Sequence, residues 1–123
     1  MNYKKFEDLP CWKVARKLSQ EIFKIITKGK LNNDYSLKDQ LWRAVGSVMD
    51  NIAERFDDGN RKEFIKFLGY AQRSCGEVQS QLYRALDCGY INESEFNVAY
   101  DLASECRKQI KGFRKYLRNY KNS

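Results

Sequence analysis

The stretch from residue 60 to residue 88, NRKEFIKFLGYAQRSCGEVQSQLYRALDC, decides the fold class. Its apolar residues recur in steps of four and three: Phe64, Leu68, Ala71, Cys75, Val78, Leu82 and Ala85. This spacing places them along one face of an α-helix, whereas a β-strand would need strict alternation. Asn60, followed three residues later by Glu63, matches the capping box that opens many helices. The stretch therefore predicts one long amphipathic helix over residues 60–88.

Three further segments with the same periodicity predict helices over residues 9–28, 36–57 and 92–120. A glycine follows the end of each of the first three helices: Gly29, Gly59 and Gly89. Glycine suits the left-handed residue that commonly stops a helix, and short connections force neighbouring helices to run antiparallel. We therefore expect a single all-α domain over residues 1–123, folded as an antiparallel up-down-up-down four-helix bundle.

Local signals also predict where the helices begin. Asp8 precedes the first helix, Ser36 with an acid three residues later is a plausible cap for the second, and Asn92 with Glu95 forms a capping box for the fourth. The link over residues 30–35 is polar, and we expect it to be mobile.

The chain is strongly basic. It carries 23 Lys and Arg against 16 Asp and Glu, a formal net charge of +7 with an isoelectric point of about 9.3. This excess favours an anionic partner such as nucleic acid, a membrane surface or an acidic protein, although it also keeps a small domain soluble. No apolar run could span a bilayer, and the basic start leads into Glu7 and Asp8 rather than an apolar signal core. We therefore expect a cytoplasmic protein outside the membrane.

Residues suited to catalysis or metal binding are scarce. The chain has no histidine, and its four cysteines lack the short spacing of a zinc ligand pair: Cys11, Cys75, Cys88 and Cys106. They follow the helical periodicity, so we interpret them as reduced and mostly small core residues. No glycine-rich phosphate loop or nucleophile motif is present. The sequence predicts a protein that is not an enzyme and needs no metal or cofactor.

Basic residues crowd the end of the fourth predicted helix: Arg107, Lys108, Lys111, Arg114, Lys115, Arg118 and Lys121. No acidic residue follows Glu105, and Tyr116 and Tyr120 are interleaved where they could stack on bases. One interpretation is a phosphate-binding ridge for RNA or DNA. The other is that these cations offset the helix dipole and keep the bundle soluble. Both interpretations stand at this point.

Polar residues form a stripe on each of the two middle helices, beside the apolar seam: Gln40, Arg43, Ser47, Asn51 and Glu54 on one, and Ser74, Glu77, Gln81 and Arg84 on the other. They either lie in solvent or line an interface between helices or subunits. We favour the interface, because an exposed stripe need not follow the heptad. Glu54 and Glu77 could also pair on a metal, but the companion Glu-x-x-His motifs of bundle metal sites are absent.

Several segments resemble one protein family. Residues 40–47, QLWRAVGS, are similar to its Q-x-x-R-A-x-x-S segment, residues 51–54 form its N-I-A-E signature, and residues 89–91 match its G-Y-[LI] turn. With Phe6–Leu9 at the start, the resemblance to the 23S ribosomal RNA intervening-sequence proteins covers almost the whole chain. The chain departs from the pattern at Arg55–Phe56, where the family usually has glycine. It also departs at Gly46, where a glycine would allow a closer helix contact.

This resemblance implies an antiparallel four-helix bundle that assembles into a barrel-shaped homopentamer, with the polar stripes at the subunit interface. A related accessory protein of diversity-generating retroelements uses a basic pentamer to bind nucleic acid and a reverse transcriptase. Together with the charge pattern, this favours a non-enzymatic homo-oligomer that binds RNA or DNA. The alternative is an adaptor whose basic face meets an acidic protein partner.

Overall fold

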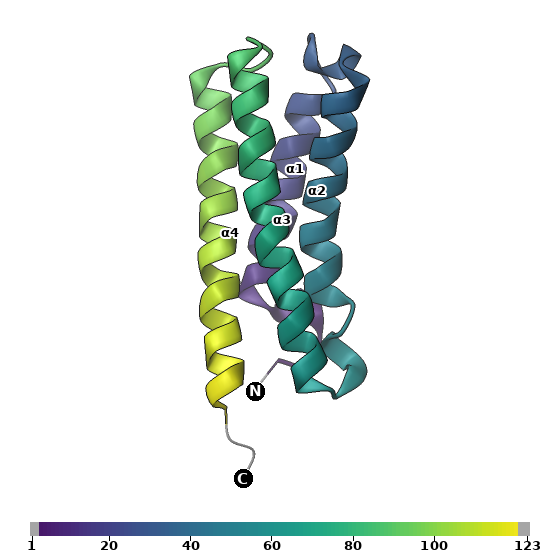
Figure 1. Cartoon of the computed structure of the whole chain (residues 1–123), viewed down its shortest axis with the longest axis vertical. Helices are drawn as coiled ribbons and strands as arrows, with labels where there is room; N and C mark the ends of the chain where they lie inside the picture. Colours follow the sequence, from purple (N-terminus) through teal and green to yellow (C-terminus); the bar gives the residue numbers. More distant parts are fainter. Residues whose placement is uncertain (1–2, 121–123) are drawn as a thin grey trace.

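A computed structural model describes residues 3–120 of the chain, and the regular structure within that range is helical throughout (Figure 1). The long helices are α1 (Pro10–Ile26), α2 (Tyr35–Ala53), α3 (Arg61–Asp87) and α4 (Glu93–Asn119). Three short 3₁₀ turns complete the described structure: Phe6–Asp8, Leu31–Asn33 and Phe56–Asp58.

The four helices form a closed bundle in which α1 contacts α2, α2 contacts α3, α3 contacts α4, and α4 contacts α1. The chain reverses direction at each connection, so consecutive helices are antiparallel, and the start of α1 and the end of α4 lie at the same end of the bundle (Figure 1). The predicted all-α four-helix bundle is confirmed, and the helix boundaries lie within four residues of those expected.

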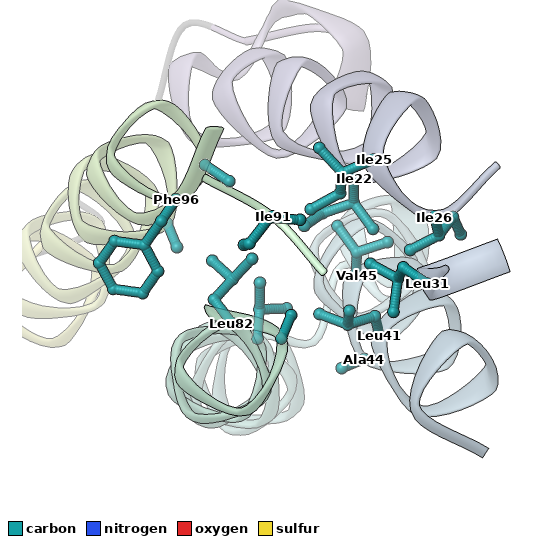
Figure 2. Close-up of a cluster of buried hydrophobic side chains, with 14 of the residues drawn as sticks. Ile22, Ile25, Ile26, Leu31, Leu41, Ala44, Val45, Leu82, Ile91 and Phe96 are labelled. Carbon is teal, nitrogen blue, oxygen red and sulfur yellow. The ribbon is translucent and has the colours of Figure 1, made fainter. Parts of the chain in front are cut away.

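The core consists of two hydrophobic clusters stacked along the bundle axis. In the upper cluster of Figure 1, Ile22, Leu41 and Leu82 converge from three helices, and Figure 2 shows them in cross-section. The lower cluster includes Ile52 and Ile110. Every predicted seam residue of α3 is buried, which confirms the periodicity argument. Each fully buried aliphatic side chain contributes about 1.5–3 kcal/mol, so this seam is the main source of stability.

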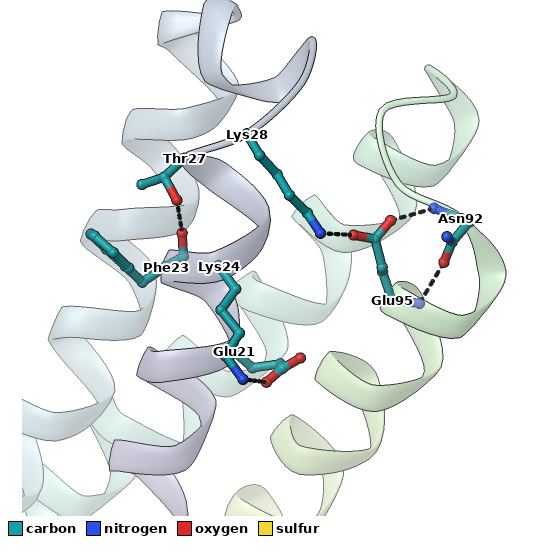
Figure 3. Close-up of polar contacts among 7 residues, drawn as sticks. All are labelled: Glu21, Phe23, Lys24, Thr27, Lys28, Asn92 and Glu95. Atoms are coloured by element: carbon teal, nitrogen blue, oxygen red, sulfur yellow. Dashed lines mark hydrogen bonds and ion pairs between the residues drawn. The ribbon is translucent and has the colours of Figure 1, made fainter.

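Two asparagine caps lie where the sequence predicts them. The Asn60 side chain accepts a hydrogen bond from the backbone N–H of Glu63 at 3.1 Å. Asn92 and Glu95 exchange side-chain and backbone hydrogen bonds in a complete capping box (Figure 3). Lys28 at the end of α1 reaches the Glu95 carboxylate at 2.9 Å and ties α1 to the start of α4. The three predicted glycine stops all have left-handed backbone, with φ between +61° and +73°.

Two predicted helix caps are wrong, although both helices begin within one residue of the predicted position. Asp34, not Ser36, caps α2 by accepting from the Leu37 N–H at 3.1 Å, and its other oxygen accepts from the Tyr90 hydroxyl at 3.0 Å. This contact with the α3–α4 connection favours the earlier cap. Asp8 belongs to a 3₁₀ turn, and α1 begins instead at Pro10, whose missing N–H is harmless in a first turn.

The connections are better packed than their polarity suggests. Leu31 is fully buried in the upper cluster, so the link over residues 30–35 is anchored to the core, contrary to the expectation of a polar, mobile link. At the other end α2 stops at Ala53, four residues early. Arg55 then lies 4.7 Å from the centre of the Phe67 ring and pairs with Asp58 at 2.9 Å. These two contacts of Arg55 hold the turn at residues 55–56, where the sequence departs from the pattern of the family it resembles.

Candidate nucleic-acid interface

Helix α4 carries a row of exposed cations, which we term the cationic face: Arg107, Lys108, Lys111, Lys115 and Arg118. They are exposed because Cys106, Ile110 and Leu117 occupy the opposite side of the helix and are buried in the core. At 3.6 residues per turn, this anchoring turns the remaining positions outward. The face spans the lower half of α4, toward the chain end (Figure 1).

The positive charge of this face is not neutralised locally. Within residues 3–120 the ion pairs join Lys24 to Glu21, Lys28 to Glu95, Arg43 to Asp39 and Arg55 to Asp58. Each of them lies away from the cationic face, where no carboxylate approaches a cation within 4.0 Å in the described part of the chain. Uncompensated charge on one face produces a positive potential that attracts anions.

Arg114 is not on the exposed face, contrary to the expectation from the sequence. Its Nε donates to the Ile65 carbonyl at 3.2 Å, and its Nη1 donates to Gln72 Oε1 at 2.8 Å. The guanidinium lies over Gly69 of α3, 2.9 Å from the position that a Cβ would occupy there. Arg114 is therefore a clamp between α3 and α4. Lys121, the last predicted member of the ridge, lies outside the described residues.

Arg73 of α3 adds to the positive charge near the cationic face, and the sequence analysis missed it. Burial lowers the pKa of the Arg114 guanidinium below its ordinary value, and the charges of Arg118 and Arg73 lower it further. Arg73 is exposed and lies 5.4 Å from the centre of the Tyr70 ring. A helical wheel of α4 alone could not identify it, because the contact depends on the register between two helices.

An aromatic row lies beside the cationic face. The Phe113 and Tyr116 rings are stacked with an interplanar angle of 15°, and the Tyr116 and Tyr120 centroids are 5.6 Å apart. Tyr116 is 47% exposed. A shallow depression of about 500 Å³ opens over it, lined by Gly112, Lys115, Tyr116, Asn119 and Tyr120. The interleaved tyrosines are thus adjacent to the cations, as their sequence positions indicate.

The two polar stripes meet in a groove between α2 and α3. Ser74 Oγ donates to Ser47 Oγ at 3.0 Å, and Asn51 Nδ2 donates to the same hydroxyl at 2.9 Å. The groove has a volume of about 350 Å³ and is lined by Gln40, Arg43, Ala44, Ser47, Ser74, Glu77 and Gln81. Part of each stripe is therefore an interface between helices of one chain, while Arg43, Glu54 and Glu77 remain exposed. Their role between subunits stays a prediction.

The structure does not bring Glu54 and Glu77 together. The Ser47–Ser74 contact sets the register, and Glu77 lines the groove beside Ala44. Glu54 is ten residues further along α2. At 1.5 Å per residue this separates the two positions by about 15 Å, too far for one metal ion. No group of three metal-ligating side chains occurs in residues 3–120.

The cysteines offer no activated thiol in the core. Cys11, Cys75 and Cys106 are buried, and Cys88 alone of the four is exposed. Burial raises the pKa of the Cys11 thiol to about 12. The pKa of the Cys106 thiol is raised by its hydrogen bond with Cys75 and by burial. Raised pKa values suppress the thiolate, which is the nucleophilic form.

A second surface feature lies between α1 and α2. Phe23, Tyr35 and Trp42 are 54%, 77% and 45% exposed, and they border an open groove of about 790 Å³. Gly46, one turn below Trp42, has nothing within 4 Å of its Cβ position. It therefore permits no closer contact inside the chain, contrary to expectation.

In the described part of the chain, no helix is long and apolar enough to cross a bilayer.

Comparisons with known proteins agree with this architecture. Residues 7–112 match the model of a family described as 23S rRNA-intervening sequence protein. The fold is similar to a crystal structure of a protein with unknown function from the S23 ribosomal protein family of Bacteroides thetaiotaomicron. The two chains share 18% identity, with a TM-score of 0.77 over 85% of this chain and 98% of the other. At that identity the likeness shows the fold alone. No curated protein matches the chain.

Proposed function

The chain belongs to the 23S rRNA-intervening sequence protein family, and from that premise we propose that it is a non-enzymatic homo-oligomer that binds RNA through the cationic face of α4. The observation that carries the proposal is the row of five exposed cations without a carboxylate partner in residues 3–120. Phosphate contacts of Lys and Arg supply most of the affinity of sequence-independent RNA binding.

The length of the cationic face along α4 argues against the alternative that these cations only offset the helix dipole. The helix dipole favours cations only within about the last turn of a helix. Arg107 and Lys108 lie more than two turns before the end of α4 at Asn119. The dipole therefore accounts for Lys115 and Arg118 but not for the start of the row.

Assembly of several copies would strengthen such a surface. Each copy binds phosphates weakly, but an oligomer presents several faces to one RNA molecule, and the second contact then forms at high effective concentration. The exposed aromatic groove of α1 and α2 and the exposed charges of the α2–α3 groove are the candidate subunit contacts.

The test is RNA binding by nuclease-treated protein, measured by fluorescence anisotropy together with light scattering after size exclusion. We expect an oligomer whose mass rises with a mixed RNA pool. Its affinity should fall on the order of a hundred-fold between about 50 and 200 mM salt, because binding to several phosphates releases their condensed counterions. An affinity that is flat across this range would exclude the mechanism.

Two matched double variants distinguish the effect of the cationic face on RNA binding from the effect of the total net charge. Lys111→Glu with Lys115→Glu removes two cations from the face. Arg16→Glu with Lys30→Glu makes the same charge change at two exposed positions off α4. We expect the first pair to weaken RNA binding at least ten-fold more than the second. Equal effects would show that only the total charge matters.

The second candidate function is an adaptor whose cationic face meets an acidic protein partner, with the exposed aromatic groove contacting that partner instead of a second copy of the chain. Solvent-exposed aromatic clusters rimmed by polar residues are common at protein interfaces. The two functions differ in what purifies with the protein. An RNA-binding oligomer should carry nucleic acid before nuclease treatment and show a raised ratio of absorbance at 260 nm to 280 nm. An adaptor should purify without it.

A further inference from the structure

Of the four glycines inside the long helices, Gly46 and Gly112 have no packing reason within the described chain, and Gly112 is the exposed one of the two. A Cβ at Gly69 or Gly76 of α3 would contact an arginine of α4, so packing explains both. A Cβ at Gly112 would meet nothing within 4 Å, and the residue is exposed. Glycine inside a helix is destabilising by about 0.5–1 kcal/mol relative to alanine. No contact inside the described chain accounts for a glycine at this position.

The effect of Gly112 is to leave the Tyr116 ring uncovered. Residues four apart on a helix lie one above the other, so a long side chain at position 112 would cover the surface beside that ring. Without one, the depression of about 500 Å³ opens there, between Lys115 and Asn119. We term this depression the Gly112 shelf.

The aromatic floor of the shelf is held in place from within the chain. The Phe113 and Tyr116 rings stack with their centroids 6.3 Å apart. The Tyr3 ring makes an edge contact with Phe113, also at a centroid distance of 6.3 Å. Tyr120 is fixed by Arg61, whose Nη1 donates to its carbonyl at 2.7 Å. A ring that is already positioned loses little conformational entropy when a flat ligand stacks on it.

The surroundings of the shelf identify the ligand by charge and shape. Lys115 forms one wall, and Lys108 and Lys111 lie within about one helical turn of Gly112. The Asn119 amide offers both a donor and an acceptor to the edge of a base. A flat π-surface beside unpaired cations is the arrangement that binds single-stranded nucleic acid, because bases stack while phosphates meet Lys and Arg.

We propose that the Gly112 shelf binds an unpaired nucleobase by stacking on Tyr116, so that the ligand of the cationic face is single-stranded RNA. This inference rests on the proposed function, since it names which RNA the cationic face selects. In a duplex the bases stack on one another, so no base face is free to stack on Tyr116. Tyr116 and Asn119 lie beyond residues 7–112, the part of the chain that matches the family model.

The test compares an unstructured RNA of about ten nucleotides, made of A and C, with its duplex and with an abasic strand of equal length. Wild type should bind the single strand about ten-fold more tightly than the abasic strand, which keeps the phosphates but has nothing to stack. Gly112→Gln and Tyr116→Leu should abolish that preference without weakening duplex binding, because both variants keep every cation. Tyr116→Phe, which retains the ring, should preserve it.

Asn97→Gln is the control, because Asn97 is an exposed position of α4 about four turns before Gly112 and lines neither candidate subunit contact. It should leave every RNA affinity unchanged. If Gly112→Gln and Tyr116→Leu keep the wild-type preference, or if wild type shows none while binding duplex and abasic strands well, the shelf is not a base site and the cationic face still binds RNA. If wild type binds none of the three strands at low salt, the proposed function fails as well.

Discussion

Two glycines of α3 show how a single residue sets the contact between helices. Gly69 and Gly76 are seven residues apart, and they lie against Arg114 and Arg107, which are seven residues apart on α4. This correspondence is what antiparallel helices with a common heptad require. The two contacts differ in closeness. The Cβ position is 2.9 Å from Arg114 Nη2 at Gly69, but 3.7 Å from Arg107 Nη1 at Gly76.

We expect alanine at these two glycines to have different effects on stability. Gly76→Ala should raise the free energy of unfolding by about 0.5–1 kcal/mol, because it improves helix propensity without a clash. Gly69→Ala should be less stable than Gly76→Ala by about 1 kcal/mol or more, because Arg114 must give up its bonds to Ile65 and Gln72. Urea unfolding of both variants measures the difference.

A double-mutant cycle assigns the cause of this difference. In an Arg114→Ala background the guanidinium is gone, so Gly69→Ala should become as favourable as Gly76→Ala. If the two glycine variants already behave alike in the wild-type background, the Arg114 clamp contributes nothing to stability.

At the scale of the helix, the start of α4 joins a cap to an ion pair. Glu95 accepts the Asn92 N–H at 3.0 Å and the Lys28 ammonium at 2.9 Å (Figure 3). The Lys28 hydrogen bond lowers the pKa of the Glu95 carboxyl, and the backbone hydrogen bond from Asn92 lowers it further. A carboxyl with a lowered pKa in the folded state stabilises the fold above its ordinary pKa. That contribution is lost as the pH falls through the folded-state value, below about 4.5.

We therefore expect Glu95→Gln to reduce the dependence of stability on pH. The glutamine keeps an oxygen for the cap but loses the charge. Wild type should be more stable than the variant near neutral pH by about 0.5 kcal/mol, the usual size of an exposed ion pair. The two proteins should converge as the pH falls through the lowered pKa of the Glu95 carboxyl. Thermal unfolding at neutral pH and across the acidic range measures this. Glu93→Gln, an exposed neighbour without a Lys partner in the described residues, is the control, and an equal effect there would contradict the role of Lys28.

The helices were predictable because their apolar spacing and asparagine caps are local signals. Leu31 and Asp34 were not, since the burial of one and the Tyr90 contact of the other come from packing between distant segments. The same reason limited the candidate site. The cationic face follows from the absence of acids after Glu105, but the inward turn of Arg114 depends on a glycine in another helix.

At the scale of the whole molecule, the two hydrophobic clusters of the core and the candidate binding surfaces are built from different residues. The core is made by residues that face the bundle axis, whereas the cationic face, the Gly112 shelf and the aromatic groove use residues that face away from it. Substitutions of these outward residues should therefore leave the fold intact. Surface changes away from caps and clamps usually alter stability by less than about 0.5 kcal/mol. Circular dichroism of each functional variant checks that its fold is kept.

The contact between α1 and α4 has one more consequence, for chain connectivity. Because α1 and α4 are neighbours and the start of α1 lies at the same end of the bundle as the end of α4, a short Gly-Ser linker can join these two helix ends (Figure 1). The exposed turn at Gly59 and Asn60 can then be opened to give new termini. We expect this circular permutant to keep the circular-dichroism spectrum and a cooperative melt, and loss of either would show that the native connection matters. A folded permutant would mean that the native order of the helices along the chain is only one of several orders that give this bundle.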